Sequence, residues 1–228
     1  MNPFRVGVVH PRRSGESERY MISTMAKKGF TRLSVALFTA ALALNNSASA
    51  ASTAEQLVKD TTDHVIMVLK EEREVIDKNP GRIYDIVNEF ILPKFDFEKM
   101  SQRVLGKYWR TATPEQRSQF INEFQVLLVR TYATALREYS DQTIQFLPTR
   151  ESAEEATVRT QIEQSGSPPI PINYELYLKD GDWKVFDIAI DGVSLVINYR
   201  STFTSEIKKN GVDGLIARLA KHNSEKTE

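Results

Sequence analysis

Two carboxylates at the end of an apolar segment are the most suggestive candidates for catalysis. Asp187 and Asp191 are four residues apart in the sequence, and extended chain of that length separates them by about 13 Å. Glycosidase carboxylates lie at most about 9.5 Å apart, so the pair fits hydrolysis poorly unless the chain bends sharply at Gly192. The alternative is structural: Asp187 accepts hydrogen bonds inside a sheet, and Asp191 ends the strand in a turn. We favour the structural interpretation.

Other catalytic and metal-binding chemistries lack suitable side chains. His64 and His222 are the only histidines after residue 50, and neither has a second ligand at metal spacing. The chain has no Cys, which excludes thiolate chemistry. Gly192 precedes Ser194 by two residues, as in a Gly-x-Ser-x-Gly nucleophile elbow, but the second glycine of that motif is replaced by Val196. We therefore expect Ser194 to cap a helix. The sequence therefore predicts no catalytic residue, no metal site and no cofactor.

Apolar and aromatic side chains are more abundant on the expected helices and strands than a small sheet needs. Core packing is the ordinary role of any one such residue, and lining an apolar pocket is the alternative. The sequence leaves both roles open for seven aromatic residues: Tyr132, Tyr139, Tyr174, Trp183, Phe186, Tyr199 and Phe203.

The first 50 residues are predicted to be absent from the mature protein. Residues 25–50 have a basic start, an apolar run at 33–44 and the small-residue site Ala48-Ser49-Ala50, as a cleavable secretory signal does. The apolar run is too short to span a bilayer. Residues 1–24 have no periodicity and are interpreted as an upstream extension or a misassigned start. Residues 51–228 are then one domain, with cleavage before Ala51.

The mature part is mildly acidic. The whole chain has 30 Lys and Arg and 30 Asp and Glu, of which residues 1–50 hold seven and two, leaving 23 basic and 28 acidic side chains and a net charge of −5. An acidic domain without a basic tract binds nucleic acid poorly and has no electrostatic attraction to anionic lipid surfaces. We predict no nucleic-acid partner.

The apolar periodicity changes from helical to strand-like after Ser140. Capping residues and prolines delimit six helical segments, at 52–79, 83–91, 96–105, 114–139, 194–207 and 213–219. Alternating segments at 144–146, 158–162, 172–178 and 183–190 predict about four strands, the last of them apolar on both faces. Helices, an antiparallel meander and further helices give an α+β fold.

Several segments resemble the MlaC family, whose members are also described as toluene-tolerance auxiliary proteins. The similarity runs from about residue 53 to 221 in conserved order and spacing, except that Asp191 stands where the family has Glu. The similarity is found in residues 104–110 (VLGKYWR), 113–117 (TPEQR) with Phe120 and Phe124, 183–187 (WKVFD), and 191–200 (DGVSLVINYR) with Phe203.

The resemblance implies a fold and a function. Its fold would be helices wrapped around a curved antiparallel sheet that enclose an apolar lipid pocket, with the lipid head group left in water. Its function would be non-enzymatic transport of phospholipid in the periplasm, between an inner-membrane Mla ABC transporter complex and an outer-membrane Mla lipoprotein–porin complex. Such transport maintains outer-membrane lipid asymmetry.

Ten residues are predicted to line this lipid pocket: Val104, Leu105, Leu128, Tyr132, Tyr174, Leu176, Val185, Val193, Val196 and Tyr199. Two rival functions remain open. One is a periplasmic carrier or chaperone for another hydrophobic molecule. The other is a small-molecule enzyme built on a similar α+β cone.

Overall fold

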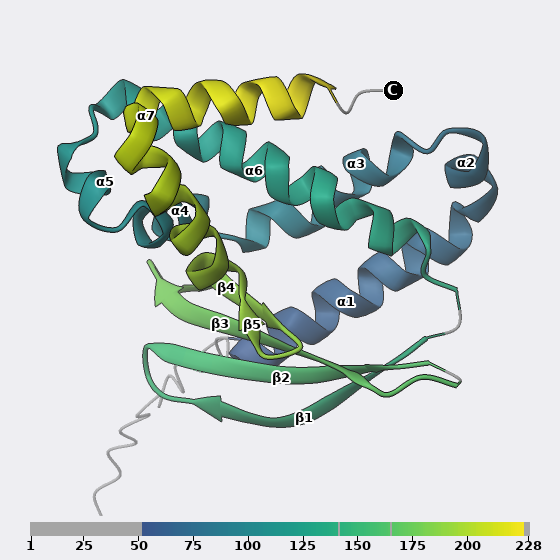
Figure 1. The fold of residues 1–228 in the computed structure, drawn as a ribbon. Coiled ribbons are helices and arrows are strands. Elements are labelled where there is room, and N and C mark those ends of the chain that lie inside the picture. The colour runs from purple at the N-terminus through teal and green to yellow at the C-terminus, as the bar shows by residue number, and fades with distance from the viewer. Residues whose placement is uncertain (1–51, 141, 165, 226–228) are drawn as a thin grey trace, which may run out of the picture. The chain divides into compact units, whose positions relative to one another are not determined.

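A computed structural model describes residues 52–140, 142–164 and 166–225 of the chain (Figure 1). The predicted signal peptide, its cleavage site and the preceding extension lie outside these residues. The described domain is formed by helices followed by an antiparallel sheet and a final long helix, so the α+β prediction is confirmed.

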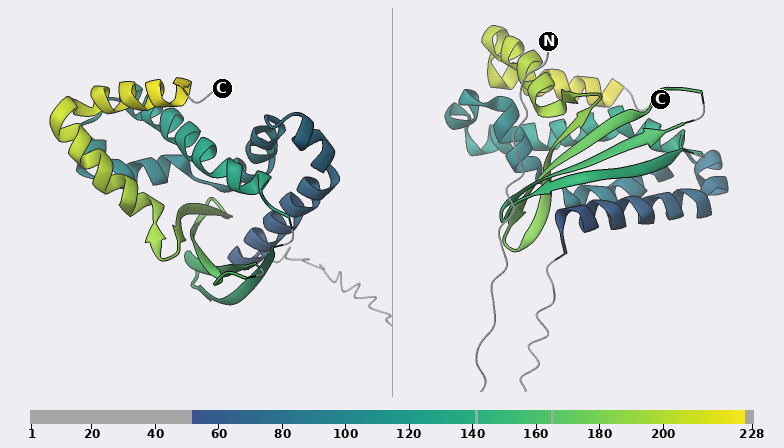
Figure 2. Two further views of the ribbon diagram at one scale, coloured as in Figure 1. Left: turned by 45° about the vertical axis from the view of Figure 1, so that its right-hand side comes forward. Right: turned by 90° about the horizontal axis from the view of Figure 1, so that it is seen from below.

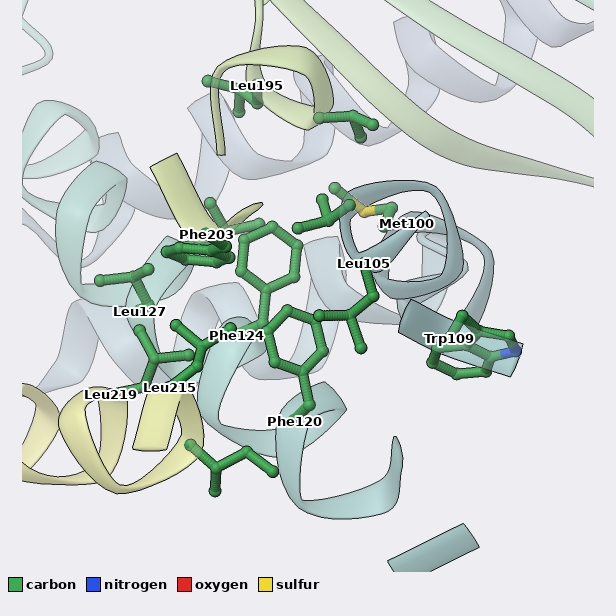
Figure 3. Packing of buried hydrophobic residues seen from close by; sticks show 14 of the residues in the cluster. Met100, Leu105, Trp109, Phe120, Phe124, Leu127, Leu195, Phe203, Leu215 and Leu219 are labelled. Carbon is green, nitrogen blue, oxygen red and sulfur yellow. The ribbon is translucent and has the colours of Figure 1, made fainter. Parts of the chain in front are cut away.

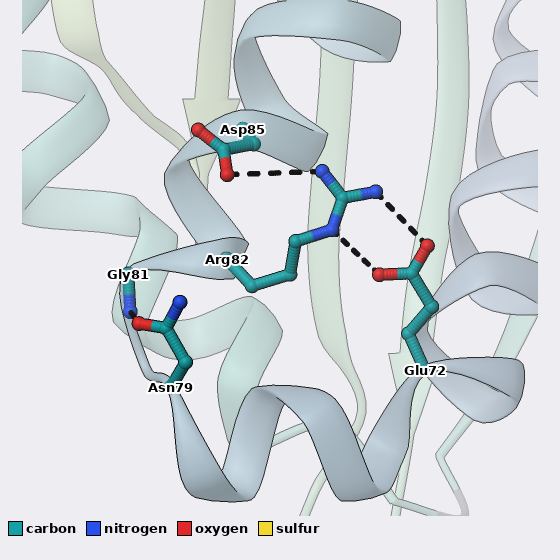
Figure 4. Close-up of polar contacts among 5 residues, drawn as sticks. All are labelled: Glu72, Asn79, Gly81, Arg82 and Asp85. Atoms are coloured by element: carbon teal, nitrogen blue, oxygen red, sulfur yellow. Dashed lines mark hydrogen bonds and ion pairs between the residues drawn. The ribbon is translucent and has the colours of Figure 1, made fainter.

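The first predicted helix is interrupted at Glu72. Its two parts are α1 (Ala54–Glu71) and α2 (Arg73–Lys78), and the N-cap of α1 is Thr53, whose hydroxyl accepts a hydrogen bond of 3.1 Å from the Gln56 amide. The sequence predicted one continuous helix over residues 52–79. At the interruption the Glu72 carboxylate accepts two hydrogen bonds from Arg82, at 2.6 and 2.9 Å (Figure 4). This pair holds the α1–α2 junction against the next helix.

The second predicted helix changes its hydrogen-bonding pattern along its length. It consists of α3 (Arg82–Ile86), the π-helical η1 (Val87–Ile91) and the 3₁₀-helical η2 (Leu92–Lys94). Pro93 lies inside η2, which ends one residue later, close to the predicted end. Apolar periodicity cannot distinguish these helix types, because all of them bury one face.

The capping predictions for the following helices are confirmed. Asp96 caps α4 (Phe97–Leu105) by accepting a 2.8 Å hydrogen bond from the Lys99 amide. Thr113 and Gln116 form the reciprocal capping box of α6 (Pro114–Arg137). Between them lies a short helix that the sequence did not predict, α5 (Lys107–Thr111).

The sheet has five antiparallel strands in sequence order, one more than expected. Its strands are β1 (Thr143–Glu151), β2 (Glu155–Glu163), β3 (Ile170–Lys179), β4 (Asp182–Ile190) and β5 (Val193–Ser194). Register shifts in the β1–β2 and β3–β4 pairs are the kind of irregularity that increases twist, and Figure 2 shows the curved strands with the helices against one side of the sheet.

The additional strand arises from a tight turn. Asp191 and Gly192 both have positive φ, 49° and 77°, as the two-residue turn of a β-hairpin requires. The turn pairs Ile190 with Val193. Ser194 then accepts a 3.0 Å hydrogen bond from the Ile197 amide, which confirms that it caps α7 (Leu195–Glu225). Gly211 interrupts α7 with a non-helical backbone, so the two predicted C-terminal helices are its two halves.

The principal core lies among α4, α5, α6 and α7 (Figure 3). Phe120 and Phe124 stack at 5.6 Å between ring centroids, and the edge of Phe203 meets both rings. Burial of each large apolar side chain contributes about 1.5–3 kcal/mol. On β4, the neighbouring residues Val185 and Phe186 are both buried, which confirms that this strand is covered on both faces.

Candidate functional site

An apolar cavity of about 350 Å³ lies between the helices and the inner face of the sheet. Its walls come from α1, η1, η2, α4, α6, four strands and the first residue of α7. The cavity is open to the surface over part of its wall. Representative lining residues, in chain order, are Leu57, Val65, Leu69, Val87, Ile91, Leu128, Leu136, Ile144, Ile162, Ile172, Ile188, Ile190 and Leu195.

The alternation of each strand explains why aliphatic residues face this cavity. Residues directly opposite each other in an antiparallel pair point to the same face of the sheet. Tyr174 is paired with Val158 on one side and with Ile188 on the other, so the three side chains share the inner face. A register shift after Glu175 pairs Leu176 with Val185, so Val185 on β4 lies on the inner face as well.

Polar groups in the cavity wall are mostly satisfied by the protein itself. The Thr61 hydroxyl donates a 2.7 Å hydrogen bond to the Leu57 carbonyl, and the Tyr139 hydroxyl donates one of 2.9 Å to the Gln142 carbonyl. Lys94 is the one charged residue among those that line the cavity. The wall therefore offers hydrocarbon surface with few free hydrogen-bonding groups.

Tyr132 and Tyr174, which line the cavity, stay neutral over the physiological pH range. Burial raises the pKa of Tyr132 to about 12, with a further contribution from the neighbouring Tyr199. Burial also raises the pKa of Tyr174, against the effect of a hydrogen bond with Thr160. Neither phenol can serve as a general base near neutral pH, because both pKa values lie above even the ordinary value for tyrosine.

Four of the ten residues predicted to line a pocket do line this cavity: Leu128, Tyr132, Tyr174 and Val185. The other six lie away from its wall. Val104, Leu105, Val196 and Tyr199 belong to the helical core, where they pack with Phe124 and Phe203 rather than beside empty space. Contact with lipid at any of the ten stays a prediction.

Leu176 and Val193 depart furthest from the expected placement. Leu176 has the inward orientation that alternation predicts, but its side chain is 0% exposed and packs with Val58, Val158 and Trp183. Val193 is 56% exposed, because β5 lies at the edge of the sheet just after the hairpin turn.

The sequence did not predict the cavity-lining residues of α1, or Ile172 on β3. Leu57, Val65 and Leu69 belong to the helix predicted at 52–79, and Ile172 belongs to the strand predicted at 172–178, but none of them was predicted to line a pocket. Periodicity identifies a buried face, but it does not tell whether that face meets other side chains or a cavity.

The carboxylate pair has a structural role. Asp187 accepts hydrogen bonds from the Ile188 amide at 2.8 Å and the Val196 amide at 3.1 Å, and the Ser194 hydroxyl donates to its second oxygen. It thereby joins β4 to the start of α7, where a negative charge is favoured by the helix dipole. Asp191 occupies the hairpin turn, as the structural interpretation required.

The part of the chain that the structure describes has neither a candidate metal site nor a candidate membrane-spanning helix. No group of three or more His, Cys, Asp and Glu side chains there could hold a metal ion. Among the same residues, no helix has the length and apolar character needed to cross a membrane.

Comparison with known families matches residues 59–221 to the family model described as MlaC protein. The chain belongs to the MlaC family. The toluene tolerance protein ttg2D of Pseudomonas putida is 30% identical over 180 residues, covering 75% of this chain and 84% of that protein. The intermembrane phospholipid transport system binding protein MlaC of Haemophilus influenzae is 28% identical over 204 residues, covering 87% and 94%.

A solved MlaC-like structure agrees with the fold. The phospholipid-binding protein from Ralstonia solanacearum, determined in complex with a phospholipid, superposes with a TM-score of 0.71 at 33% identity. The match covers 76% of this chain and 98% of the Ralstonia chain. The likeness therefore extends over nearly the whole of the Ralstonia chain.

Proposed function

We propose that this protein is a periplasmic phospholipid carrier that holds acyl tails in the apolar cavity and leaves the head group in water. The cavity of about 350 Å³, lined almost entirely by hydrocarbon, is the observation that carries the proposal. The phospholipid in the Ralstonia relative supports the choice of ligand. The physiological partners would be the inner-membrane Mla ABC transporter complex and the outer-membrane Mla lipoprotein–porin complex.

The physical requirement on such a carrier is severe. Two acyl tails have about 30 methylene groups, and at ~0.8 kcal/mol each their exposure to water would cost more than ~20 kcal/mol. A wall of aliphatic side chains removes that cost. Since a bilayer interior is also hydrocarbon, loading and unloading are then nearly balanced in free energy. Direction would be set by the partner complexes rather than by this chain.

The same geometry favours broad head-group tolerance. A head group that stays in water differs little in free energy between the loaded carrier and the bilayer surface, so it contributes little to discrimination among lipids. The apolar wall interacts with tails, which different phospholipids share.

Mass spectrometry of organic extracts from the gently purified native protein tests the proposal. We expect roughly one phospholipid per protein, with mixed head groups. Detergent-free protein that contains no phospholipid and takes none from vesicles would contradict it, and copurification with acylated protein would indicate a chaperone instead.

A further inference from the structure

A row of aliphatic side chains leads from the cavity to the edge of the sheet. Ile172 pairs with Ile190, and Ile190 pairs with Val193 across the Asp191–Gly192 turn. Directly opposite residues share a face, so all three side chains lie on the cavity side. Ile172 and Ile190 line the cavity, whereas Val193 is 56% exposed.

A second row ends in the same way at the same end of the sheet. Ile144 pairs with Ile162, and Ile162 pairs with Ile170. The first two line the cavity, and Ile170 is 37% exposed. The two rows are neighbours, because Ile170 and Ile172 are alternate residues of β3. In each row, apolar surface therefore continues from the cavity wall to an exposed side chain.

The exposed residue in the first turn of α7 does not continue these rows. Leu195 lines the cavity, whereas Ile197 follows it by two residues of helix and therefore lies about 200° away, on the opposite side of α7. We call Ile170 and Val193, the exposed residues that end the two rows, the aliphatic rim. Large exposed apolar residues are usually scattered singly, so two of them that continue the wall of one cavity indicate an interaction site.

We propose that the aliphatic rim is the portal of the cavity, where it contacts the hydrocarbon of a phospholipid layer while acyl tails enter and leave. This inference rests on the proposed function and assigns a place to its transfer step. A tail that crosses the rim exchanges one apolar surface for the next and exposes fewer methylene groups to water. The rim thus lowers the barrier to transfer.

The composition of the rim favours hydrocarbon over a protein partner as its occupant. Protein interfaces draw most of their binding energy from Trp, Tyr and Arg, with Val under-represented. The rim consists of Ile and Val alone and continues directly into a wall of the same chemistry. An acyl chain has no polar group that would be left without a hydrogen-bond partner on such a surface.

Uptake from protein-free vesicles tests the portal. Delipidated mature protein is mixed with phosphatidylcholine vesicles that contain pyrene-labelled phosphatidylcholine, and the initial rate and the final occupancy are recorded. The double variant Ile170→Thr, Val193→Thr should take up lipid roughly tenfold more slowly and still reach wild-type occupancy. Val193→Thr alone changes the more exposed of the two positions, where folding is least affected, and should slow uptake roughly threefold.

A matched control carries comparable changes away from the cavity wall. Val75 and Met67 are 49% and 44% exposed on α2 and α1, and neither lines the cavity. Val75→Thr with Met67→Gln should leave the uptake rate unchanged. Wild-type rates in both rim variants, with normal filling, would overturn the portal alone and assign the rim to a protein partner. A wild-type protein that never fills would overturn the proposed function, and the portal with it.

Discussion

Individual residues decide whether the inner face of the sheet is cavity or core. Leu176 and Ile188 both lie on that face, on neighbouring strands. Leu176 is fully buried among protein side chains, whereas Ile188 lines the cavity and keeps partial exposure. Alternation alone gives the two residues the same role, and only the packing around each one separates them.

Substitution by Trp at these two positions distinguishes the roles. Ile188→Trp places the added ring in space that an acyl chain would use, so bound lipid should fall sharply while the delipidated protein keeps nearly its original unfolding midpoint. Leu176→Trp overpacks a filled interior and should lower the free energy of unfolding by ~1–3 kcal/mol. Lipid extraction and thermal unfolding measure both. Equal effects of the two variants on both observables would show that the cavity boundary is drawn wrongly.

The starts of the helices could be predicted from neighbouring residues, whereas the breaks inside the elements could not. Thr113 with Gln116, and Asp96, begin their helices as predicted, because a cap depends on a few neighbouring residues. At the interruption of the first helix, Glu72 binds Arg82, ten residues away, and the two-residue β5 is defined by its pairing with β4. Hydrophobic periodicity does not reveal contacts between residues that are distant in the sequence.

The cavity was predictable as a property of the family but not residue by residue. Tyr132 and Tyr174 were predicted to line the lipid pocket that the resemblance to the MlaC family implies, and they do line the cavity. Val104 and Leu105 were predicted to line the same pocket and instead fill the helical core. Sequence gives the apolar face of each element, whereas the space left between faces depends on how all the elements pack.

One polar cluster fixes α4 to the β3–β4 hairpin. Asp96 is 6% exposed; it caps α4, accepts a hydrogen bond from the Tyr177 hydroxyl and forms a 2.7 Å ion pair with Lys179. Burial opposes ionisation of this carboxyl, but these hydrogen bonds prevail and its pKa lies below the ordinary value of 3.8. The ionised form is therefore the one that stabilises the fold.

Asp96→Asn should lower the free energy of unfolding at neutral pH by about 1–3 kcal/mol, since an amide gives weaker hydrogen bonds and no ion pair. Because the folded-state pKa is lowered, the contribution of Asp96 is complete above the unfolded value near 3.8 and is lost as the pH falls through the folded value. Urea unfolding between pH 7 and pH 3 should show the two proteins converging at acid pH. A difference that stays constant over this range would exclude an ionised Asp96 as its source.

At the scale of the whole molecule, the signal predicted in residues 25–50 is expected to direct the protein across a membrane. Intact mass spectrometry of the exported protein should give a chain that begins at Ala51, because small residues occupy the minus-three and minus-one positions at Ala48 and Ala50. A mature product that still begins near Met25 would contradict export by a cleaved signal.

The net charge of the mature chain makes a last prediction about lipid loading. Residues 51–228 carry 23 basic and 28 acidic side chains, so the domain bears a charge of −5 and is repelled by an anionic surface. Uptake from phosphatidylglycerol vesicles should be slower than uptake from phosphatidylcholine vesicles at 10 mM salt, where the Debye length is about 30 Å. At 1 M salt, where it is about 3 Å, the two rates should become similar. Phosphatidylcholine vesicles serve as the control, since their rate should change little with salt. Faster uptake from the anionic vesicles at low salt would mean that a local cationic surface, rather than the net charge, governs the encounter with lipid.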